Sequence, residues 1–399
     1  MQQSRRLPHP PVASRERDPS RVDWMELFFD LIFVALVAQL AHGLSHEPTF
    51  GTLLLFLALF ASVWWSWVNL TFTVNVTPEL TRRALGVTML SAMFAVGAIA
   101  VAAPEATGAR AWLFAAGNAA LRLVLLALWI RRSWSNGAGS RIRLVAYNGV
   151  TAVLWLISIA LPHPFDFALW ALAIATEVVL LVASASRWAG GTLDRINVEH
   201  LSERFGLLVI IVLGESVLST VDALDGSFTL PSGITAALAL LVASLLAWSF
   251  FQYGTNAMQA GLDALRTAGN FRAVRDTVGF LPYLVVSGVT VISGALASAI
   301  AHPEHPLPVV SAVSLGGGIA LFFLTNAFIS LRFGRSWADV LRWAIPAVAL
   351  PLILIGVALV VPAAVSTLLA VLVLGFVVAS SERSTRRQAA AGADPTAAP

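Results

Sequence analysis

The chain has 399 residues, of which 58% are hydrophobic and only 12% are charged, with a mean hydropathy of +0.80 and a formal net charge of +3. Soluble domains are about 45–50% apolar and about 25% charged, so this chain has too few polar residues to cover a water-exposed surface. These values exclude an ordinary soluble domain and argue against a nucleic-acid-binding protein. The lipid bilayer is therefore the expected solvent for most of the chain.

In chain order, the polar, Arg- and Pro-rich residues 1–24 predict a disordered cytoplasmic tail. A helix that spans the bilayer needs about 20 mostly apolar residues. Backbone groups in hydrocarbon must be paired within the segment, so each apolar run is expected to be an α-helix. Twelve such runs follow, at 25–44, 50–74, 84–103, 111–131, 144–161, 167–186, 204–221, 232–253, 278–301, 307–331, 340–361 and 363–380. A second disordered cytoplasmic tail is expected over 381–399, and the predicted fold class is an all-α polytopic membrane protein with about twelve transmembrane helices.

Arginine residues indicate the orientation of these spans. They concentrate in the N-terminal tail, in the even-numbered connections between spans and in the C-terminal tail. Because cytoplasmic loops carry the excess of positive charge, both termini are expected in the cytoplasm. The first span of each half begins with an acidic residue, Glu26 in the first half and Glu203 in the second. This weak similarity between the halves is compatible with two parallel six-helix repeats over 25–190 and 200–380.

Two stretches carry polar residues embedded in long apolar frames. They are Asp23-Trp24-Met25-Glu26-Leu27-Phe28-Phe29-Asp30-Leu31-Ile32-Phe33-Val34 followed by Gln39-Leu40-Ala41-His42, and Glu203-Arg204-Phe205-Gly206-Leu207 followed by Ile211-Val212-Leu213-Gly214-Glu215-Ser216. These motifs resemble the signature of the bacterial low temperature requirement protein A family, over about residues 20–380. The resemblance implies a multi-pass protein of the bacterial inner (plasma) membrane, in a family named for a link to growth in the cold. It implies no mechanism.

Three ionisable residues are expected near the middle of the bilayer. At about 1.5 Å per residue, Arg122 lies about 16 Å into the fourth span, Glu177 about 15 Å into the sixth and Glu215 about 16 Å into the seventh. Charges at this depth usually face the protein interior. The three side chains are predicted to meet, either as a structural ion pair or as a site that binds a solute or protons, with Asn118 and Ser216 in supporting positions.

The first span carries a second set of polar candidates. Glu26 and Asp30 share a face because they are one helical turn apart. Glu26 is expected to complement the helix dipole and to support Asp30, a candidate solute- or proton-binding residue whose alternative role is to pair with Arg204. Arg204 is otherwise expected to anchor its helix at the interface. Gln39 and His42 either line an outer vestibule or bond a neighbouring helix.

Helix-breaking residues lie inside two of the later spans. Gly316-Gly317-Gly318 is expected to form a hinge or a close helix crossing, and Pro346 and Pro351 are expected to kink their helix. The sequence contains no Cys, and its histidines lack the spacing of a stable metal site. Neither a metal nor a cofactor is therefore expected.

The leading functional hypothesis is a secondary carrier of a small solute, with proton coupling left open. One alternative is a non-transporting membrane stress or scaffold protein whose buried ion pairs only hold helices together. The other is a membrane-embedded enzyme that acts on lipid, although no catalytic motif supports it and the protein is not expected to be an enzyme. The expected partners are the lipid bilayer, a small-molecule solute and protons, without nucleic acid, and the oligomeric state stays open.

Overall fold

The computed structural model describes residues 22–46, 48–77, 80–133, 146–184, 195–253 and 255–392, and this described part is helical without a β-strand. The predicted all-α polytopic fold is therefore confirmed. The tail predicted over residues 1–24 lies almost entirely outside the described residues.

Eleven described helices are long and apolar enough to cross a membrane, and a twelfth, shorter apolar helix covers Tyr147–Ser158. The short helix is made of a π-helical turn, η2 (Ala146–Val150), that continues into α6 (Thr151–Ser158). The other crossing helices are α1 (Trp24–His46), α2 (Phe50–Asn75), α3 (Arg82–Ala102), α4 (Ala111–Ser133), α7 (Phe165–Ser184), α9 (Val198–Asp225), α10 (Leu230–Tyr253), α13 (Leu281–Ala301), α14 (Val309–Arg332), α15 (Trp337–Ala358) and α16 (Ala363–Gly392). All twelve predicted runs thus correspond to apolar helices.

Three parts of the structure differ from the prediction. The helix α9 begins six residues before the predicted start at 204, because Asn197 caps it by accepting a hydrogen bond from the backbone N–H of His200 at 3.1 Å. The helix α16 continues to Gly392, so the tail predicted to be disordered from residue 381 is helical up to that residue. An amphipathic helix, α11 (Thr255–Thr267), and the short α12 (Phe271–Arg275) and η4 (Asp276–Phe280) connect α10 to α13.

The two halves of the chain pack their helices in the same order of neighbours. In the first half, α1 contacts α3, α3 contacts α4, α4 contacts α6, α6 contacts α7, α7 contacts α2, and α2 contacts α1 again. In the second half, the same order runs through α9, α13, α14, α15, α16 and α10 back to α9. Matching positions in the two halves therefore have matching neighbours, which is the arrangement that two parallel repeats predict.

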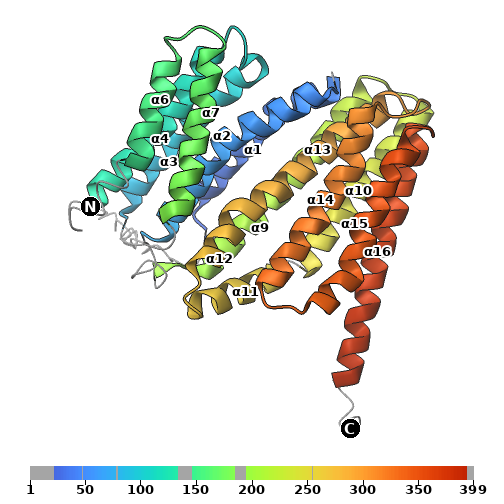
Figure 1. Cartoon of the computed structure of the whole chain (residues 1–399). Helices are drawn as coiled ribbons and strands as arrows, with labels where there is room; N and C mark the ends of the chain where they lie inside the picture. Colours follow the sequence, from blue (N-terminus) through green and yellow to red (C-terminus); the bar gives the residue numbers. More distant parts are fainter. Residues whose placement is uncertain are drawn as a thin grey trace, which may run out of the picture.

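The halves meet at three helices in the middle of the molecule. The helix α1 packs against α9 and α13, and Figure 1 shows these three between the bundle of α3, α4, α6 and α7 and the bundle of α10, α14, α15 and α16. The helix α13 is nearly all buried. In Figure 1, α1 begins and α16 ends on the lower side of the molecule, as an even number of crossings requires.

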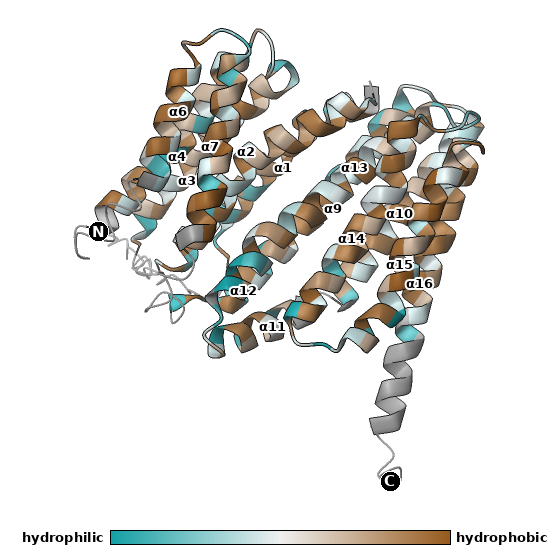
Figure 2. Cartoon of the chain, viewed as in Figure 1, coloured by the Kyte–Doolittle hydropathy of each residue, from teal (hydrophilic) through white to brown (hydrophobic). Residues whose placement is uncertain are grey.

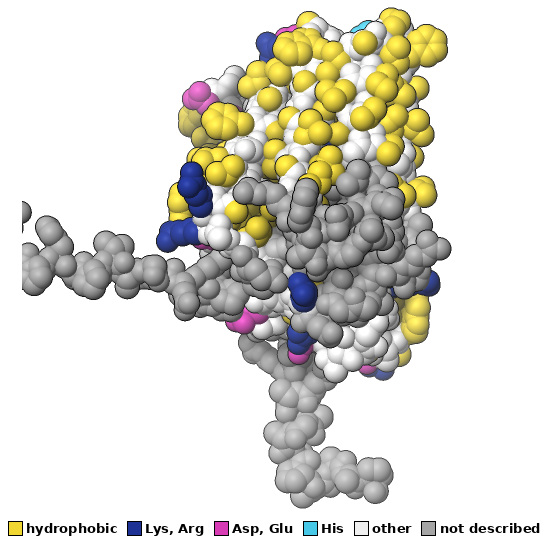
Figure 3. Space-filling model, turned by 90° about the vertical axis from the view of Figure 1, so that its left-hand side faces the viewer, with side chains coloured by type: hydrophobic (Ala, Val, Ile, Leu, Met, Phe, Trp, Pro, Cys, Tyr) yellow, Lys and Arg dark blue, Asp and Glu magenta, His cyan; other side chains and the backbone are white. Residues whose placement is uncertain are grey.

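The outer surface of the helices is apolar. Phe94 and Ile353 are 80% and 63% exposed, and Figure 2 shows hydrophobic residues along the lengths of the helices with hydrophilic residues nearer their ends. On the face in Figure 3, hydrophobic side chains cover the upper part and Arg side chains gather below them. An apolar belt of this extent is suited to lipid and not to water.

The triple glycine forms a close crossing. A Cβ atom on Gly316 would lie 2.3 Å from the carbonyl oxygen of Pro351, and one on Gly318 would lie 2.9 Å from that of Gly288. Small residues allow the backbones of membrane helices to approach in this way. Both α14 and α15 are continuous, so neither the glycines nor the two prolines interrupt a helix.

Candidate functional site

Arg122 and Glu177 form a buried ion pair between α4 and α7. The guanidinium donates from Nε and Nη2 to the two carboxylate oxygens of Glu177, at 2.6 and 3.0 Å. Its Nη1 donates to the backbone oxygen and the Oδ1 of Asn118, at 3.0 and 2.9 Å, and Nη2 also donates to the backbone oxygen of Ser62 at 2.7 Å. The predicted contacts of Arg122 with Glu177 and with Asn118 are therefore confirmed.

All the hydrogen-bond donors of Arg122 are used in this ion pair and the contacts beside it. A guanidinium has five N–H groups, and five bonds account for all of them. The Trp155 ring covers the guanidinium, with 5.3 Å from Cζ to the ring centroid. Because no donor of Arg122 is left to bind a ligand, the arrangement is that of a structural contact that holds α2, α4 and α7 together.

Glu215 does not join this pair, and the expectation that three midplane charges meet is wrong for that reason. Its side chain is half-buried on α9, a helix of the second half, and it has no hydrogen bond or ion pair with the described residues. Depth along a helix places a residue at a height, but the rotation of the helix decides which neighbour the side chain faces. The adjacent Ser216 returns its hydroxyl to the backbone oxygen of Val212 at 3.3 Å.

A second buried charge cluster lies between α1 and α9. Arg204 donates from Nε and Nη2 to the two oxygens of Asp30, at 3.2 and 3.1 Å, and from Nη1 to Glu26 Oε2 at 3.0 Å. All three side chains have a solvent-exposed fraction of 0%. The pairing of Asp30 with Arg204 is therefore confirmed, whereas the expected role of Arg204 as an interfacial anchor is corrected by its burial. Glu26 lies in the first turn of α1, where an acid complements the helix dipole, and it also accepts a bond from Arg204.

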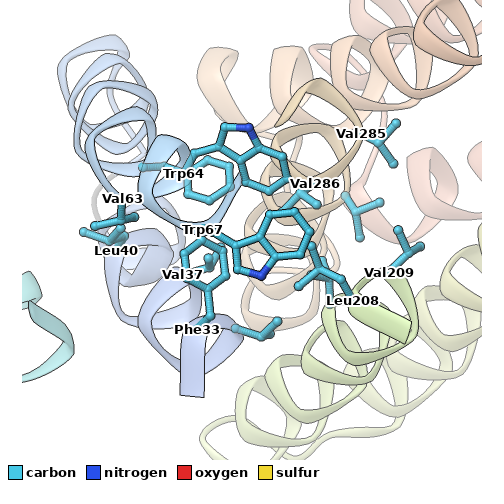
Figure 4. Close-up of a cluster of buried hydrophobic side chains, with 14 of the residues drawn as sticks. Phe33, Val37, Leu40, Val63, Trp64, Trp67, Leu208, Val209, Val285 and Val286 are labelled. Carbon is cyan, nitrogen blue, oxygen red and sulfur yellow. The ribbon is translucent and has the colours of Figure 1, made fainter. Parts of the chain in front are cut away.

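Aromatic side chains surround this cluster on its upper side. The indole N–H of Trp67 donates to Asp30 Oδ1 at 2.8 Å, and the guanidinium of Arg204 lies over the Trp67 ring at 5.6 Å. Trp67 stacks on Trp64 at 5.1 Å between ring centroids, and Phe33 lies 6.1 Å from Trp67. Figure 4 shows the two indoles packed among apolar side chains of α1, α9 and α13.

Two residues that the sequence reasoning missed extend the cluster below Glu26. His200 lies one turn before Arg204 on α9, and its Nε2 is 3.2 Å from Glu26 Oε2, although the contact is poorly aligned for a hydrogen bond. Its Nδ1 is 3.3 Å from the Nδ2 of Asn75. A signal was present in the sequence, because His200 and Arg204 have the same four-residue spacing on α9 as Glu26 and Asp30 have on α1.

The cluster combines two carboxylates, Glu26 and Asp30, with the guanidinium of Arg204 and the imidazole of His200 in a buried site. Buried charges are stable only when they are paired and hydrogen-bonded. A group of this cluster that gains or loses a proton therefore changes the energy of all its partners.

A small cavity lies beside the cluster, on the side of α11. Its volume is about 10 Å³, which is room for about one water molecule. Trp67, which bonds to Asp30, is part of the wall. The buried hydroxyls of Thr71 and Thr277 also line it, and neither has a hydrogen-bond partner among the described residues. The two hydroxyls are groups to which a water molecule could bond, and Met258 and Leu262 of α11 also line the cavity.

The remaining predicted residues lie apart from both clusters. Gln39 and His42 are exposed on α1, beyond the aromatic residues. The structure therefore brings together Glu26 and Asp30 from the predicted set in one place, and Arg122, Glu177 and Asn118 in another.

Comparison with known proteins identifies the family of this chain. The model of a family described as bacterial low temperature requirement A protein matches residues 21–379. The chain is also 27% identical over 328 residues to an uncharacterized protein of Rhizobium meliloti (strain 1021), an alignment that covers 78% of this chain and 77% of the relative. No solved structure matches the chain. Because the family model spans nearly all of the helical region, the chain belongs to the bacterial low temperature requirement A protein family.

Proposed function

We propose that the protein is a secondary carrier of a small solute, coupled to protons through the buried cluster of Glu26, Asp30, Arg204 and His200. The observation that carries this proposal is the buried cluster of two carboxylates, one guanidinium and one imidazole between the first helices of the two halves. A coupling site needs a group that gains and loses a proton during transport, and carboxylates and imidazoles are such groups.

The position of the cluster supports the same function. It joins α1 and α9, which are the first helices of the two halves and pack against each other. In carriers built from repeats, ligand sites lie between the repeats, and alternating access moves one repeat against the other. The aromatic residues above the cluster and α11 below it are then the barriers that open in turn.

The orientation follows from charge. Arg residues dominate the connections on the side where α1 begins and α16 ends, so we infer that this side faces the cytoplasm of a bacterial inner membrane. The charged cluster is then nearer the cytoplasmic surface, because Asp30 lies about 9 Å along α1 from Trp24.

A scaffold role is the second candidate, and the saturated Arg122–Glu177 pair favours it. That pair connects helices without leaving a donor for a ligand. The carrier function and the scaffold function rest on different clusters of the molecule, so each cluster is tested separately. The proposed function includes no enzymatic step.

Flux measurements in proteoliposomes test the carrier function. The purified protein is reconstituted, a pH gradient is imposed, and the uptake of a panel of radiolabelled small solutes is followed together with an internal pH dye. We expect gradient-dependent uptake of at least one solute in the wild type, and its loss in Glu26→Gln. Glu203→Gln, which changes an exposed acid on α9, is the matched control and should keep full flux.

The alternatives have distinct outcomes in this experiment. If no solute moves in wild-type vesicles and Glu26→Gln only reduces the amount of folded protein, the scaffold function replaces the carrier. If the protein converts lipid in detergent without a gradient, the enzyme function replaces it.

A further inference from the structure

We propose that the cavity beside the charged cluster binds one water molecule between Thr71 and Thr277, and that α11 is the lid that opens this water site to the cytoplasm. The inference deepens the proposed function, on which its part in transport rests, by giving the route along which water reaches the cluster from the inner side. It depends on the wall and the cover of the cavity, so it is measurable without transport.

Two buried hydroxyls make the cavity a site for water. Thr71 of α2 and Thr277 of η4 are 2% and 0% exposed, and neither hydroxyl has a hydrogen-bond partner among the described residues. A buried hydroxyl without a partner is unfavourable, and each hydroxyl can both donate and accept. Because both line a volume of about 10 Å³, a water molecule there lies beside both of them. One bound water therefore satisfies two buried groups at once.

The size and the wall of the cavity favour water over other ligands. No acidic or basic residue lines it among the described part of the chain, and the residues around the two threonines are apolar or aromatic. A divalent cation is bound by several oxygen atoms, with carboxylates among them. An organic solute needs a far larger pocket. Water fits both the volume and the two hydroxyls.

Trp67 connects the water site to the charged cluster. Its indole is part of the cavity wall, and the indole N–H donates to Asp30 Oδ1 at 2.8 Å. Phe205, which also lines the cavity, directly follows Arg204 on α9. The cavity and the cluster therefore share a wall, and water in the cavity is in position to reach Asp30 when the indole moves.

The cavity lies near the cytoplasmic ends of its helices. Thr71 is about one turn before the end of α2 at Asn75, and the lining residue Leu201 is about one turn after the start of α9. The helix α2 runs back to the side on which α1 begins, and Figure 1 shows α11 on that same lower side of the molecule. Water that enters past α11 therefore comes from the side that we assign to the cytoplasm.

The helix α11 covers the cavity on this side. Met258 and Leu262 are one turn apart on α11, and both are buried in the cavity wall. On the other face of the same helix, Ala264 is exposed and the side chain of Asp263 is 56% exposed. One layer of helix therefore lies between the water site and the solvent.

The attachment of α11 suits a helix that moves as a unit. Gly269, two residues after its end, has a φ of 67°, a backbone angle that favours glycine and turns the chain before α12. A Cβ atom on Gly261 would lie 2.2 Å from a ring carbon of Phe333, the residue that follows α14. The aromatic ring of Phe333 thus holds the lid closed by direct contact, and removing the ring should loosen it.

Single cysteines report access to the cavity, because the chain contains no Cys of its own. Thr277→Cys places a thiol in the cavity wall. Thr73→Cys is the matched control, since Thr73 is equally buried on α2 but its hydroxyl bonds to Asn69 and not to the cavity. Ala264→Cys marks the exposed face of α11. Membrane vesicles of either orientation are treated with a charged, membrane-impermeant thiol reagent, and the labelling rates are compared.

The expected rates separate the lid from general flexibility. From the cytoplasmic side, Ala264→Cys should be labelled fastest, Thr277→Cys more slowly and Thr73→Cys not measurably. Adding Phe333→Ala should raise the rate of Thr277→Cys several-fold and leave Thr73→Cys unlabelled, and Thr71→Cys repeats the test from the opposite wall. Labelling of Thr277→Cys that is no faster than that of Thr73→Cys in both backgrounds, or that occurs only from the outer side, overturns the inference.

Melting temperatures test the bound water separately from the lid. Thr277→Val replaces the hydroxyl by a methyl group of similar shape. We expect a lower melting temperature, because the variant loses its hydrogen bond to water. Thr290→Val, which loses a bond of 2.9 Å to the backbone oxygen of Val286, gives the size of such a loss. A higher melting temperature in Thr277→Val would mean that an unpaired hydroxyl had been removed, and it overturns the water site.

Neither measurement uses solute flux. A water site with a lid, but without any flux in the wild type, would retain this inference and remove the carrier function. Flux without access of the reagent to Thr277→Cys would do the reverse.

Discussion

The guanidinium of Arg204 holds both carboxylate oxygens of Asp30, at 3.2 and 3.1 Å, across 174 residues of sequence. This two-point contact joins the first helix of one half to the first helix of the other. It is a strong polar link between the halves, because both groups are charged and fully buried.

Removing the cation of this link should destabilise the whole molecule. Arg204→Gln leaves Asp30 and Glu26 buried without their partner, and breaking one side of a buried ion pair typically costs about 3–5 kcal/mol. We expect a corresponding decrease in the free energy of unfolding, measured by denaturant titration in detergent. Arg342→Gln, which changes an exposed arginine of α15, is the control and should differ little from the wild type. A stable Arg204→Gln protein would show that the halves are held together by packing alone.

The Arg122–Glu177 pair should be dispensable as a unit. Glu177→Gln leaves the guanidinium partly unpaired and should cost about 3–5 kcal/mol. Replacing both residues by Met should recover most of the loss, because buried ion pairs can be exchanged for apolar side chains of similar volume. Unfolding free energies of the single and double variants measure the recovery. The double variant should also keep solute flux, and a folded double variant without flux would place this pair in the transport site instead.

Glu215 should behave unlike Glu26. Its side chain is half-buried and has no ion pair with the described residues, so Glu215→Gln removes no observed interaction. We expect unfolding free energy and proton-coupled flux close to the wild type, where Glu26→Gln loses the flux. If the two variants lose flux equally, the coupling site extends along α9 to the middle of the bilayer.

The glycine crossing offers a test with an internal control. In Gly316→Ala, the new methyl group would lie 2.3 Å from the carbonyl oxygen of Pro351, and such overpacking typically costs about 1–3 kcal/mol. In Gly317→Ala, the nearest contact is an ordinary 3.8 Å to a Val313 methyl, so the neighbouring substitution should be neutral. Thermal unfolding of the two variants compares them directly. Equal melting temperatures would mean that α14 and α15 are not packed as closely as described.

The amino-acid sequence alone was sufficient for the membrane class, the twelve apolar helices and the Asp30–Arg204 partnership as one of two alternatives. These features depend on local quantities, namely the length of each apolar run and the type of residue at each end. A run of about 20 apolar residues has the same meaning in any fold, because the thickness of the bilayer sets it.

Helix boundaries were harder to predict, and one of them changed the site. The predicted span begins only at residue 204, which places Arg204 at the interface. The cap at Asn197 instead starts α9 earlier and brings His200 and Arg204 onto one buried face of the helix. The capping side chain was present in the sequence, but its effect depends on the contact of Asn197 with Asn75 from α2.

The partners of the midplane charges were decided only by the tertiary structure. Sequence counting predicts similar depths for Arg122, Glu177 and Glu215, but depth is a position along a helix, whereas contact also requires the right neighbours and the right rotation about each axis. Packing sets both, through side chains far apart in the chain. For that reason Arg122 faces Glu177 and Asn118, Glu215 faces neither, and a second charged cluster lies between α1 and α9, where two four-residue spacings from distant segments come together.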